Sequence, residues 1–193
     1  MARPREFDEQ TVLDAARDEF WEHGVAATSI SQLSAATGLS VGSLYKAFSS
    51  KGELCALTLD RYLDDGLDVM GALLDSGDTT VDGIDAWLGA LADMASNSDG
   101  PRGCYGVVCA VELAGDEPEI RDRLRRHDER LVGRLTDALR SAQAEGADVT
   151  GPLDDAARFL YTAINGVQVE ARKGIDGDQA RRTLAIARRA VIR

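Results

Sequence analysis

The stretch that decides the fold spans residues 29–48 and reads SISQLSAATGLSVGSLYKAF. Ser29 and Gln32 have the spacing of a capping box, so we expect a helix to begin here and to end at Gly38. Ser40 can then cap a second short helix over the remaining residues. Two short helices joined by a tight turn at a glycine form a helix-turn-helix, and we predict one here.

The side chains within this stretch suit such a motif. Leu33, Leu39 and Leu44 would supply the inner contacts, and Ser34 is the small residue where the two helices cross. The second helix would turn short, polar, aromatic and cationic side chains outward, namely Ser40, Gly42, Ser43, Tyr45 and Lys46. The major groove of B-DNA is wide enough for one α-helix, so this surface fits insertion into that groove.

A helix before this stretch completes a three-helix head. Asp8 is a good N-cap and Gly24 a good left-handed stop, which places the helix over residues 8–23. Its inward stripe is expected to hold Val12, Leu13, Ala16 and Phe20. We therefore predict that residues 1–51 form a helix-turn-helix domain.

The remaining residues, 52–193, are predicted to form a helical body. Apolar residues recur at helical spacing between glycine and proline breaks, which predicts helices over residues 50–74, 80–95, 104–114, 118–145, 153–173 and 178–192. The segment 104–114 is apolar on almost every side and is expected to be a centrally buried helix, although its valines leave a strand as the alternative. The protein is therefore predicted to be all-α, with about nine helices in two domains.

The charge distribution singles out the head. The formal net charge of −11 argues by itself against a nucleic-acid partner, because phosphate binding relies on Lys and Arg. However, no acidic residue stands between Glu22 and Glu53, where the average frequency in the chain predicts about five. The head therefore has a surface without acidic residues, while the rest of the chain is acidic. For this reason the negative net charge of the whole chain does not exclude DNA binding through the head.

Other classes of protein find little support in the sequence. No apolar run approaches the roughly 20 residues of a membrane span, and the basic start lacks the apolar run of a secretory signal. Cys55, Cys104 and Cys109 lack zinc-ligand spacing and fit a reducing cytoplasm, the expected location. No nucleophile elbow, phosphate loop or metal motif stands out, so no catalytic residue, metal or cofactor is expected and a helical enzyme is disfavoured.

Taken together, residues 28–51 resemble the DNA-binding head of the tetracycline-repressor (TetR) family. The matching residues are Thr28-Ser29-Ile30, Leu33, the run from Gly38 to Tyr45, Phe48 and Ser50-Lys51. The resemblance implies a ligand-responsive transcriptional repressor that binds a near-palindromic, double-stranded operator as a homodimer formed through its last two helices. It also implies that a small-molecule effector binds in the body and releases the DNA. An activator or a protein-binding scaffold with the same head is the alternative.

The resemblance further implies roles for individual residues. Tyr45, Lys51 and Thr28 would contact phosphates, whereas Ser40, Gly42, Ser43 and Lys46 would approach bases or the backbone. Lys51 carries an argument of its own, because a cation in the first turn of a helix opposes the helix dipole and so suggests an anionic partner.

Several body residues are candidates for the effector cavity. They lie on or near inward stripes of the predicted helices and are Trp87, Met94, Cys104, Val108, Tyr161 and Asn165. The alternative is that they are core residues, although the amide of Asn165 needs a hydrogen-bond partner wherever it lies. His127 is expected to be a structural histidine. Cys104 and Cys109 would lie on different faces of one helix, so a disulfide between them would require the helix to unwind.

Overall fold

The computed structural model describes residues 7–95 and 102–193, and within these ranges it contains nine α-helices and no β-strand. The helices are α1 (Glu9–His23), α2 (Ile30–Thr37), α3 (Val41–Phe48), α4 (Lys51–Leu74), α5 (Thr80–Ala95), α6 (Tyr105–Leu113), α7 (Pro118–Ala144), α8 (Leu153–Ala171) and α9 (Gly177–Val191). The all-α prediction is confirmed, and each predicted boundary lies within two residues of the observed one.

The predicted caps explain why the first four helices begin where they do. The side chains of Asp8, Ser29, Ser40 and Ser50 each accept a hydrogen bond from a backbone N–H in the first turn of their helix. Ser29 and Gln32 form the complete, reciprocal capping box. Because these bonds satisfy donors that an uncapped helix would leave free, the sequence defines the start of each helix of the head locally.

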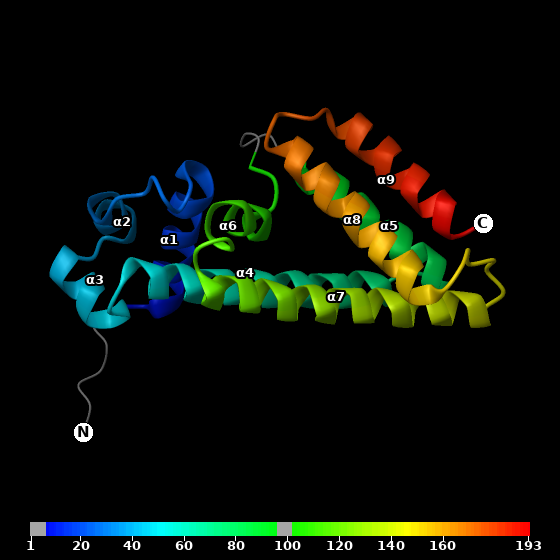
Figure 1. The fold of residues 1–193 in the computed structure, drawn as a ribbon, viewed down its shortest axis with the longest axis horizontal. Coiled ribbons are helices and arrows are strands. Elements are labelled where there is room, and N and C mark those ends of the chain that lie inside the picture. The colour runs from blue at the N-terminus through cyan, green and yellow to red at the C-terminus, as the bar shows by residue number, and fades with distance from the viewer. Residues whose placement is uncertain (1–6, 96–101) are drawn as a thin grey trace, which may run out of the picture.

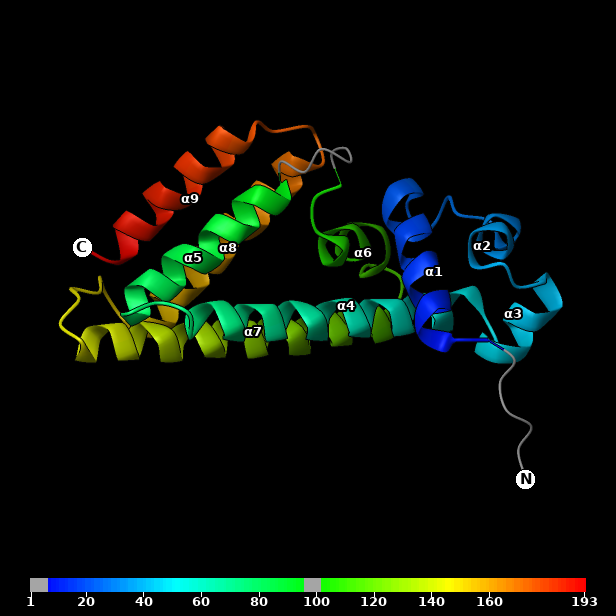
Figure 2. The ribbon, with the colours of Figure 1, turned by 180° about the vertical axis from the view of Figure 1, so that it is seen from behind.

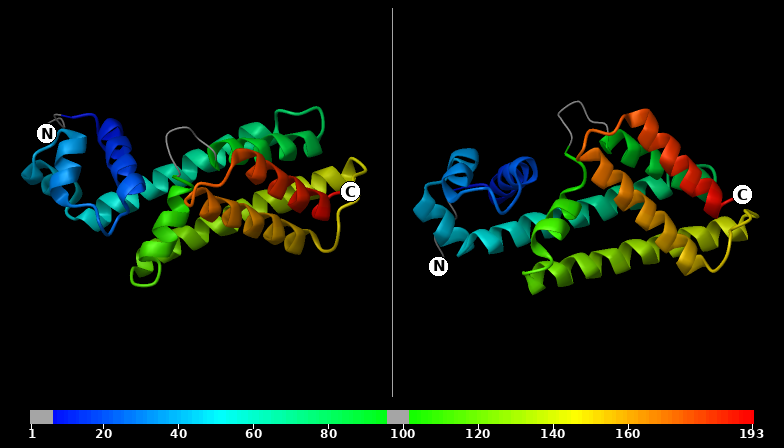
Figure 3. Two further views of the ribbon diagram at one scale, coloured as in Figure 1. Left: turned by 90° about the horizontal axis from the view of Figure 1, so that it is seen from above. Right: turned by 45° about the horizontal axis from the view of Figure 1, so that its top comes forward.

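The helices form a head and a body joined by α4 (Figure 1). Helices α1, α2 and α3 surround the N-terminal end of α4, while α5, α8 and α9 stack at its other end, and α7 runs beside α4 (Figure 2). Helix α6 lies between the two groups. In Figure 3 the head lies at one end of α4, away from α9, and Arg172 at the C-terminal end of α8 donates to the Trp21 carbonyl of α1 at 2.6 Å, so α4, α6 and the end of α8 connect the body to the head.

Two hydrophobic cores correspond to this division. The head core joins buried residues of α1 to α3, such as Phe20, Leu33 and Leu44, to the first half of α4 and to Tyr105 and Cys109 of α6. The body core joins α5, α8 and α9 to the second half of α4 and to α7. Helix α6 therefore adds its buried side chains to the head core, while its neighbouring helices are chiefly α7 and α4.

One expectation for the segment 104–114 is wrong. The segment is helical, which excludes the strand alternative, but it is not buried all round: Val111 is 79% exposed. The reason is that α6 packs one side against the head core, through Tyr105 and Cys109, and leaves its last turn open to solvent. Within residues 7–95 and 102–193, no helix is both long and apolar enough to cross a membrane.

Candidate DNA interface and ligand cavity

Helix α3 presents a polar outer face and an apolar inner face. Leu44 and Phe48 are each 2% exposed and belong to the head core, whereas Tyr45 is 50% exposed. The other exposed residues on this helix and its cap are Ser40, Val41, Gly42, Ser43 and Lys46. All five residues predicted for the outward surface of the second helix therefore lie on it.

The turn between α2 and α3 is fixed by local hydrogen bonds. Gly38 adopts the left-handed conformation at φ 70°, which residues with a Cβ rarely adopt. The Ser34 hydroxyl donates to the carbonyl oxygen of Leu39 at 2.6 Å, and the Thr37 hydroxyl donates to that of Leu33 at 2.7 Å. Ser34 is thus more than a small residue at the crossing, because its side chain holds the turn that orients α3.

Two residues predicted to contact phosphate have other partners in the structure. Thr28 is 1% exposed and its hydroxyl donates to the Gly24 carbonyl at 2.6 Å, so its side chain does not face the surface where DNA would lie. The Lys51 ammonium donates to the carbonyl oxygens of Val25 and Thr28, both at 2.9 Å, and to that of Ala26 at 3.4 Å. These carbonyls explain why a cation stands in the first turn of α4, so the helix dipole gives no separate argument for a phosphate partner.

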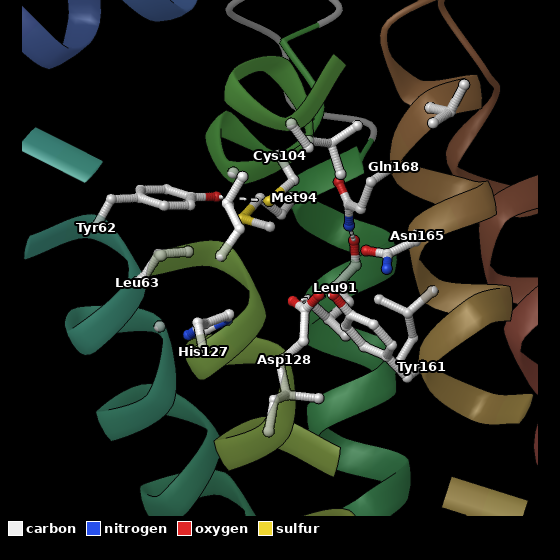
Figure 4. A pocket seen from close by; sticks show the side chains of 18 of the residues that line it. Tyr62, Leu63, Leu91, Met94, Cys104, His127, Asp128, Tyr161, Asn165 and Gln168 are labelled. Carbon is white, nitrogen blue, oxygen red and sulfur yellow. Dashed lines mark hydrogen bonds between the residues drawn. The ribbon is translucent and has the colours of Figure 1, made fainter. Parts of the chain in front are cut away.

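A cavity of about 700 Å³, partly open to solvent, lies in the body and is lined by α4, α5, α6, α7 and α8 (Figure 4). Its wall is largely apolar and includes Leu63, Leu91, Leu124 and Leu131 together with Tyr62 and Trp87. Its volume is in the range of cavities that bind small molecules in other proteins. A mostly apolar cavity with few polar groups suits a ligand with one polar end.

Five of the six candidate effector residues lie around this cavity. Trp87, Met94, Cys104, Tyr161 and Asn165 line it, although they come from three different segments of the chain, α5, the start of α6 and α8. Val108 does not. It is 6% exposed and packs in the head core, and its neighbour Val107 lines the cavity instead, because successive residues of a helix point about 100° apart.

The polar groups of the cavity gather near α8. The Tyr161 hydroxyl donates to a carboxylate oxygen of Asp128, and both side chains are labelled in Figure 4. Burial raises the pKa of Asp128, and burial, followed by the bond to Asp128, raises that of Tyr161. Gln168 is 2% exposed and donates weakly to the Leu91 carbonyl at 3.4 Å, while its Oε1 has no hydrogen-bond partner in the part of the chain that the structure describes.

Sequence reasoning missed Asp128 and Gln168 as cavity residues, although a signal was present. Leu124, His127, Asp128 and Leu131 have the i, i+3, i+4, i+7 spacing of an inward stripe, so the spacing alone places Asp128 on the apolar side of α7. His127 also lines the cavity, and its buried Nδ1 has no hydrogen-bond partner among the described residues, contrary to the expectation of a satisfied structural histidine. Burial and the nearby Arg130 lower the pKa of His127 to about 4.

The cysteines separate as the helical spacing predicts. Cys104 lies at the cavity, where it accepts a hydrogen bond from the Tyr62 hydroxyl at 3.5 Å, whereas Cys109 is buried in the head core. Cys109 lies within hydrogen-bonding reach of Cys55, and that bond, together with burial, raises the pKa of the Cys109 thiol. Cys109 therefore stays a protonated thiol near neutral pH and is a poor nucleophile.

The comparisons with known proteins agree with this arrangement. Residues 12–56 match the family described as bacterial regulatory proteins, tetR family, and residues 80–187 match the tetracyclin repressor-like C-terminal domain. The HTH-type transcriptional repressor ComR of Escherichia coli K12 is 33% identical over 178 residues, which cover 89% of this chain and 83% of ComR. The repressor BdcR of the same organism is 24% identical over 193 residues, 98% of this chain and 91% of BdcR.

A solved structure extends the likeness to DNA binding. A cysteine mutant of the TetR family transcriptional regulator CifR, complexed with 26-bp double-strand operator DNA, superposes with a TM-score of 0.85 at 27% sequence identity. The match covers 97% of this chain and 99% of the CifR chain. These relatives are transcriptional regulators, not enzymes. The chain therefore belongs to the TetR family and is a DNA-binding transcriptional regulator.

Proposed function

We propose that this protein is a ligand-responsive repressor that binds a near-palindromic operator as a homodimer and leaves it when a small molecule occupies the body cavity. The observation that carries the proposal is the combination of an outward, acid-free α3 with a 700 Å³ cavity in the same chain. We propose residues 1–51 as the domain that contacts DNA and residues 52–193 as the domain that binds the effector and the second subunit.

On the DNA, α3 would enter the major groove. Tyr45 and Lys46 would contact the backbone, and Ser43 would lie near base edges, with Ser40 and Gly42 close to the duplex at the start of the helix. A Cβ at Gly42 would meet no atom of the protein within 4 Å, so the glycine is not required by packing inside the head. Its absence of a side chain is useful where a helix start must approach DNA closely.

The second subunit would pack on α8 and α9. Phe159 of α8 is 50% exposed and Ile186 of α9 is 61% exposed, although both are large and apolar. Exposed apolar residues on adjacent helices are typical of an interface between subunits. A two-fold dimer through this face would present two α3 helices to successive major grooves on one side of the DNA.

Helix α6 would transmit the state of the cavity to the head. Gly106, Val107 and Ala110 of α6 line the cavity, and the carboxylate of Glu112, one turn later, accepts a hydrogen bond from the Ala26 backbone N–H at 3.1 Å. Ala26 belongs to the loop that leads into α2. A ligand that shifts α6 would therefore shift the loop that positions the helix-turn-helix.

The experiment begins with selection of binding sequences from a random duplex pool by the purified protein. Fluorescence anisotropy on the selected duplex should then give an affinity that falls steeply with salt, with a log-log slope of about −0.9 for each phosphate neutralised. Tyr45→Ala should weaken binding to all duplexes, while Ser43→Ala should also change the preferred bases. Val111→Ala is the control, because Val111 is exposed and lies on α6, outside the helix-turn-helix.

Two outcomes would contradict the proposal. If no duplex is enriched at low salt and the protein instead captures a protein partner with little salt dependence, the scaffold alternative holds. If the protein binds the selected site and raises transcription from an adjacent promoter in vitro, it is an activator. Repression that a cavity ligand relieves would support the proposal.

A further inference from the structure

The charged groups of the cavity are all of one sign. Two aspartates, Asp65 and Asp128, line it, and no described residue of its wall is Lys or Arg. The only other ionisable side chain of basic type is His127, which stays neutral near pH 7 because burial lowers its pKa to about 4. Any ligand inside the cavity therefore meets negative charge without a compensating cation in the wall.

The two aspartates differ in what neutralises them. The side chain of Asp65 is 63% exposed and its carboxylate lies 3.8 Å from the guanidinium of Arg61, so solvent and a cation already screen it. Asp128 is half-buried, and its carboxylate accepts a hydrogen bond from the hydroxyl of Tyr161, a neutral donor. No ion pair within 4 Å involves Asp128 among the residues that the structure describes. Burial raises the pKa of Asp128, and the hydrogen bond from Tyr161 and the charge of Arg158 only partly oppose this shift.

The other polar groups near Asp128 are uncharged, namely the hydroxyl of Tyr161 and the amides of Asn165 and Gln168. Asn165 and Gln168 lie on the same side of the cavity, and the Gln168 Oε1 is buried without a hydrogen-bond partner in residues 7–95 and 102–193. Leaving a buried acceptor unpaired is unfavourable, and a donor on a ligand would relieve this. Tyr62 and Trp87 also line the cavity and offer aromatic rings, which attract cations and also pack against apolar groups.

We propose, on the basis of the function proposed above, that the effector is a lipophilic organic cation. Its ammonium group binds the carboxylate of Asp128 and the nearby amide of Gln168. Its apolar part lies against Leu63, Leu91 and the aromatic residues of the wall. A carboxylate or phosphate ligand is disfavoured because it would meet Asp128 with no positively charged side chain in the wall to compensate.

The test uses three probes of matched length and different charge. These are n-octylamine, which is protonated at pH 7.5, n-octanol and n-octanoate, titrated into the full-length protein without DNA and followed by calorimetry. Octylammonium should bind about tenfold or more tightly than octanol, since hydrogen bonds to charged groups contribute about 1.5–3 kcal/mol, and octanoate should bind most weakly.

Three variants assign the preference to one carboxylate. Asp128→Asn should lower the affinity for octylammonium to that for octanol. The affinity for octanol itself should not change, which would show that the cavity is still formed in the variant. Tyr161→Phe removes the hydrogen bond but keeps the carboxylate, so the preference for the cation should persist. Asp137→Asn is the matched control on the same helix, because Asp137 is exposed and does not line the cavity.

The result that would overturn the inference is octanol or octanoate binding as tightly as octylammonium, or a cation preference that survives Asp128→Asn. Failure of all three probes to bind would overturn it as well. The release of DNA is measured separately. If octylammonium binds through Asp128 and the selected duplex stays bound, the inference holds and the proposed ligand response fails. If neutral or anionic molecules release the DNA, the ligand response holds and the inference fails.

Discussion

Replacing Lys51 by Met separates a structural role for this residue from a role in binding phosphate. The Lys51 ammonium donates two hydrogen bonds of 2.9 Å and one of 3.4 Å to the loop between α1 and α2. Hydrogen bonds to a charged group contribute about 1.5–3 kcal/mol, and Lys51 is only partly buried, so we expect Lys51→Met to lower the free energy of unfolding by about 2 kcal/mol. For a chain of this length the melting temperature should fall by roughly 4–8 °C.

Lys46→Met is the matched control. Lys46 lies on the exposed face of α3, with no hydrogen bond or ion pair to the described residues, so its replacement should change the free energy of unfolding by about 0.5 kcal/mol or less. It should instead weaken DNA binding and reduce the log-log salt slope by about 0.9 for each head. Thermal melting by circular dichroism and anisotropy titrations at several salt concentrations measure both effects. If Lys51→Met melts like the wild type and shows the loss of slope, Lys51 binds phosphate and the structural reasoning is refuted.

Three further predictions concern the body. Gly83→Ala should destabilise the protein by about 1–3 kcal/mol in a urea titration, because the new Cβ would lie 2.2 Å from the Leu74 carbonyl oxygen, whereas Gly89→Ala on the same helix meets nothing within 4 Å and should be neutral or stabilising. Burial lowers the pKa of His127 from 6.5 to about 4 in the folded protein, so as the pH falls the histidine is protonated in the unfolded chain before it is protonated in the folded one. The free energy of unfolding should therefore decrease as the pH drops from 6.5 to about 4. His127→Leu should remove about 1 kcal/mol of that fall, a value reduced for partial exposure, and an unchanged pH profile would contradict this. Ile186→Glu should shift a dimer toward monomers in sedimentation, and unaltered dimers would exclude this face of α9.

The head could be predicted from the sequence because its structure depends on local signals. Capping serines, an i+3 glutamine and a glycine at the turn each act within a few residues, and the structure confirms all of them. Lys51 and Thr28 are different. The Thr28 hydroxyl bonds to a carbonyl only four residues earlier, which buries the side chain. The carbonyls that Lys51 contacts lie 23 to 26 residues away, so no local pattern indicates the Lys51 contacts.

The cavity could be predicted only in part, since helical spacing gives the inward side of a helix but not the gap between helices. Five of six candidates line the cavity because they lie on inward stripes. Val108 lies on an inward stripe too, yet α6 directs it to the head core, and only the packing of α6 between the head and the body decides this. Asp128 shares its stripe with Leu124 and Leu131 but was not among the predicted cavity residues.

Three aromatic residues offer a physical basis for the proposed coupling between cavity and head. Tyr62 lines the cavity, and its ring meets that of Trp21 in α1 at 5.2 Å and that of Tyr105 in α6 at 5.6 Å, both nearly edge to face. Such pairs contribute about 0.5–1.5 kcal/mol each beyond their burial. A tenfold loss of DNA affinity requires only about 1.4 kcal/mol of difference between the two states, so a ligand that moved Tyr62 away from both rings would supply enough. Tyr62, Trp21 and Tyr105 all pack in or against the head core, so the proposed regulation would act through a local repacking of that core where it meets the cavity.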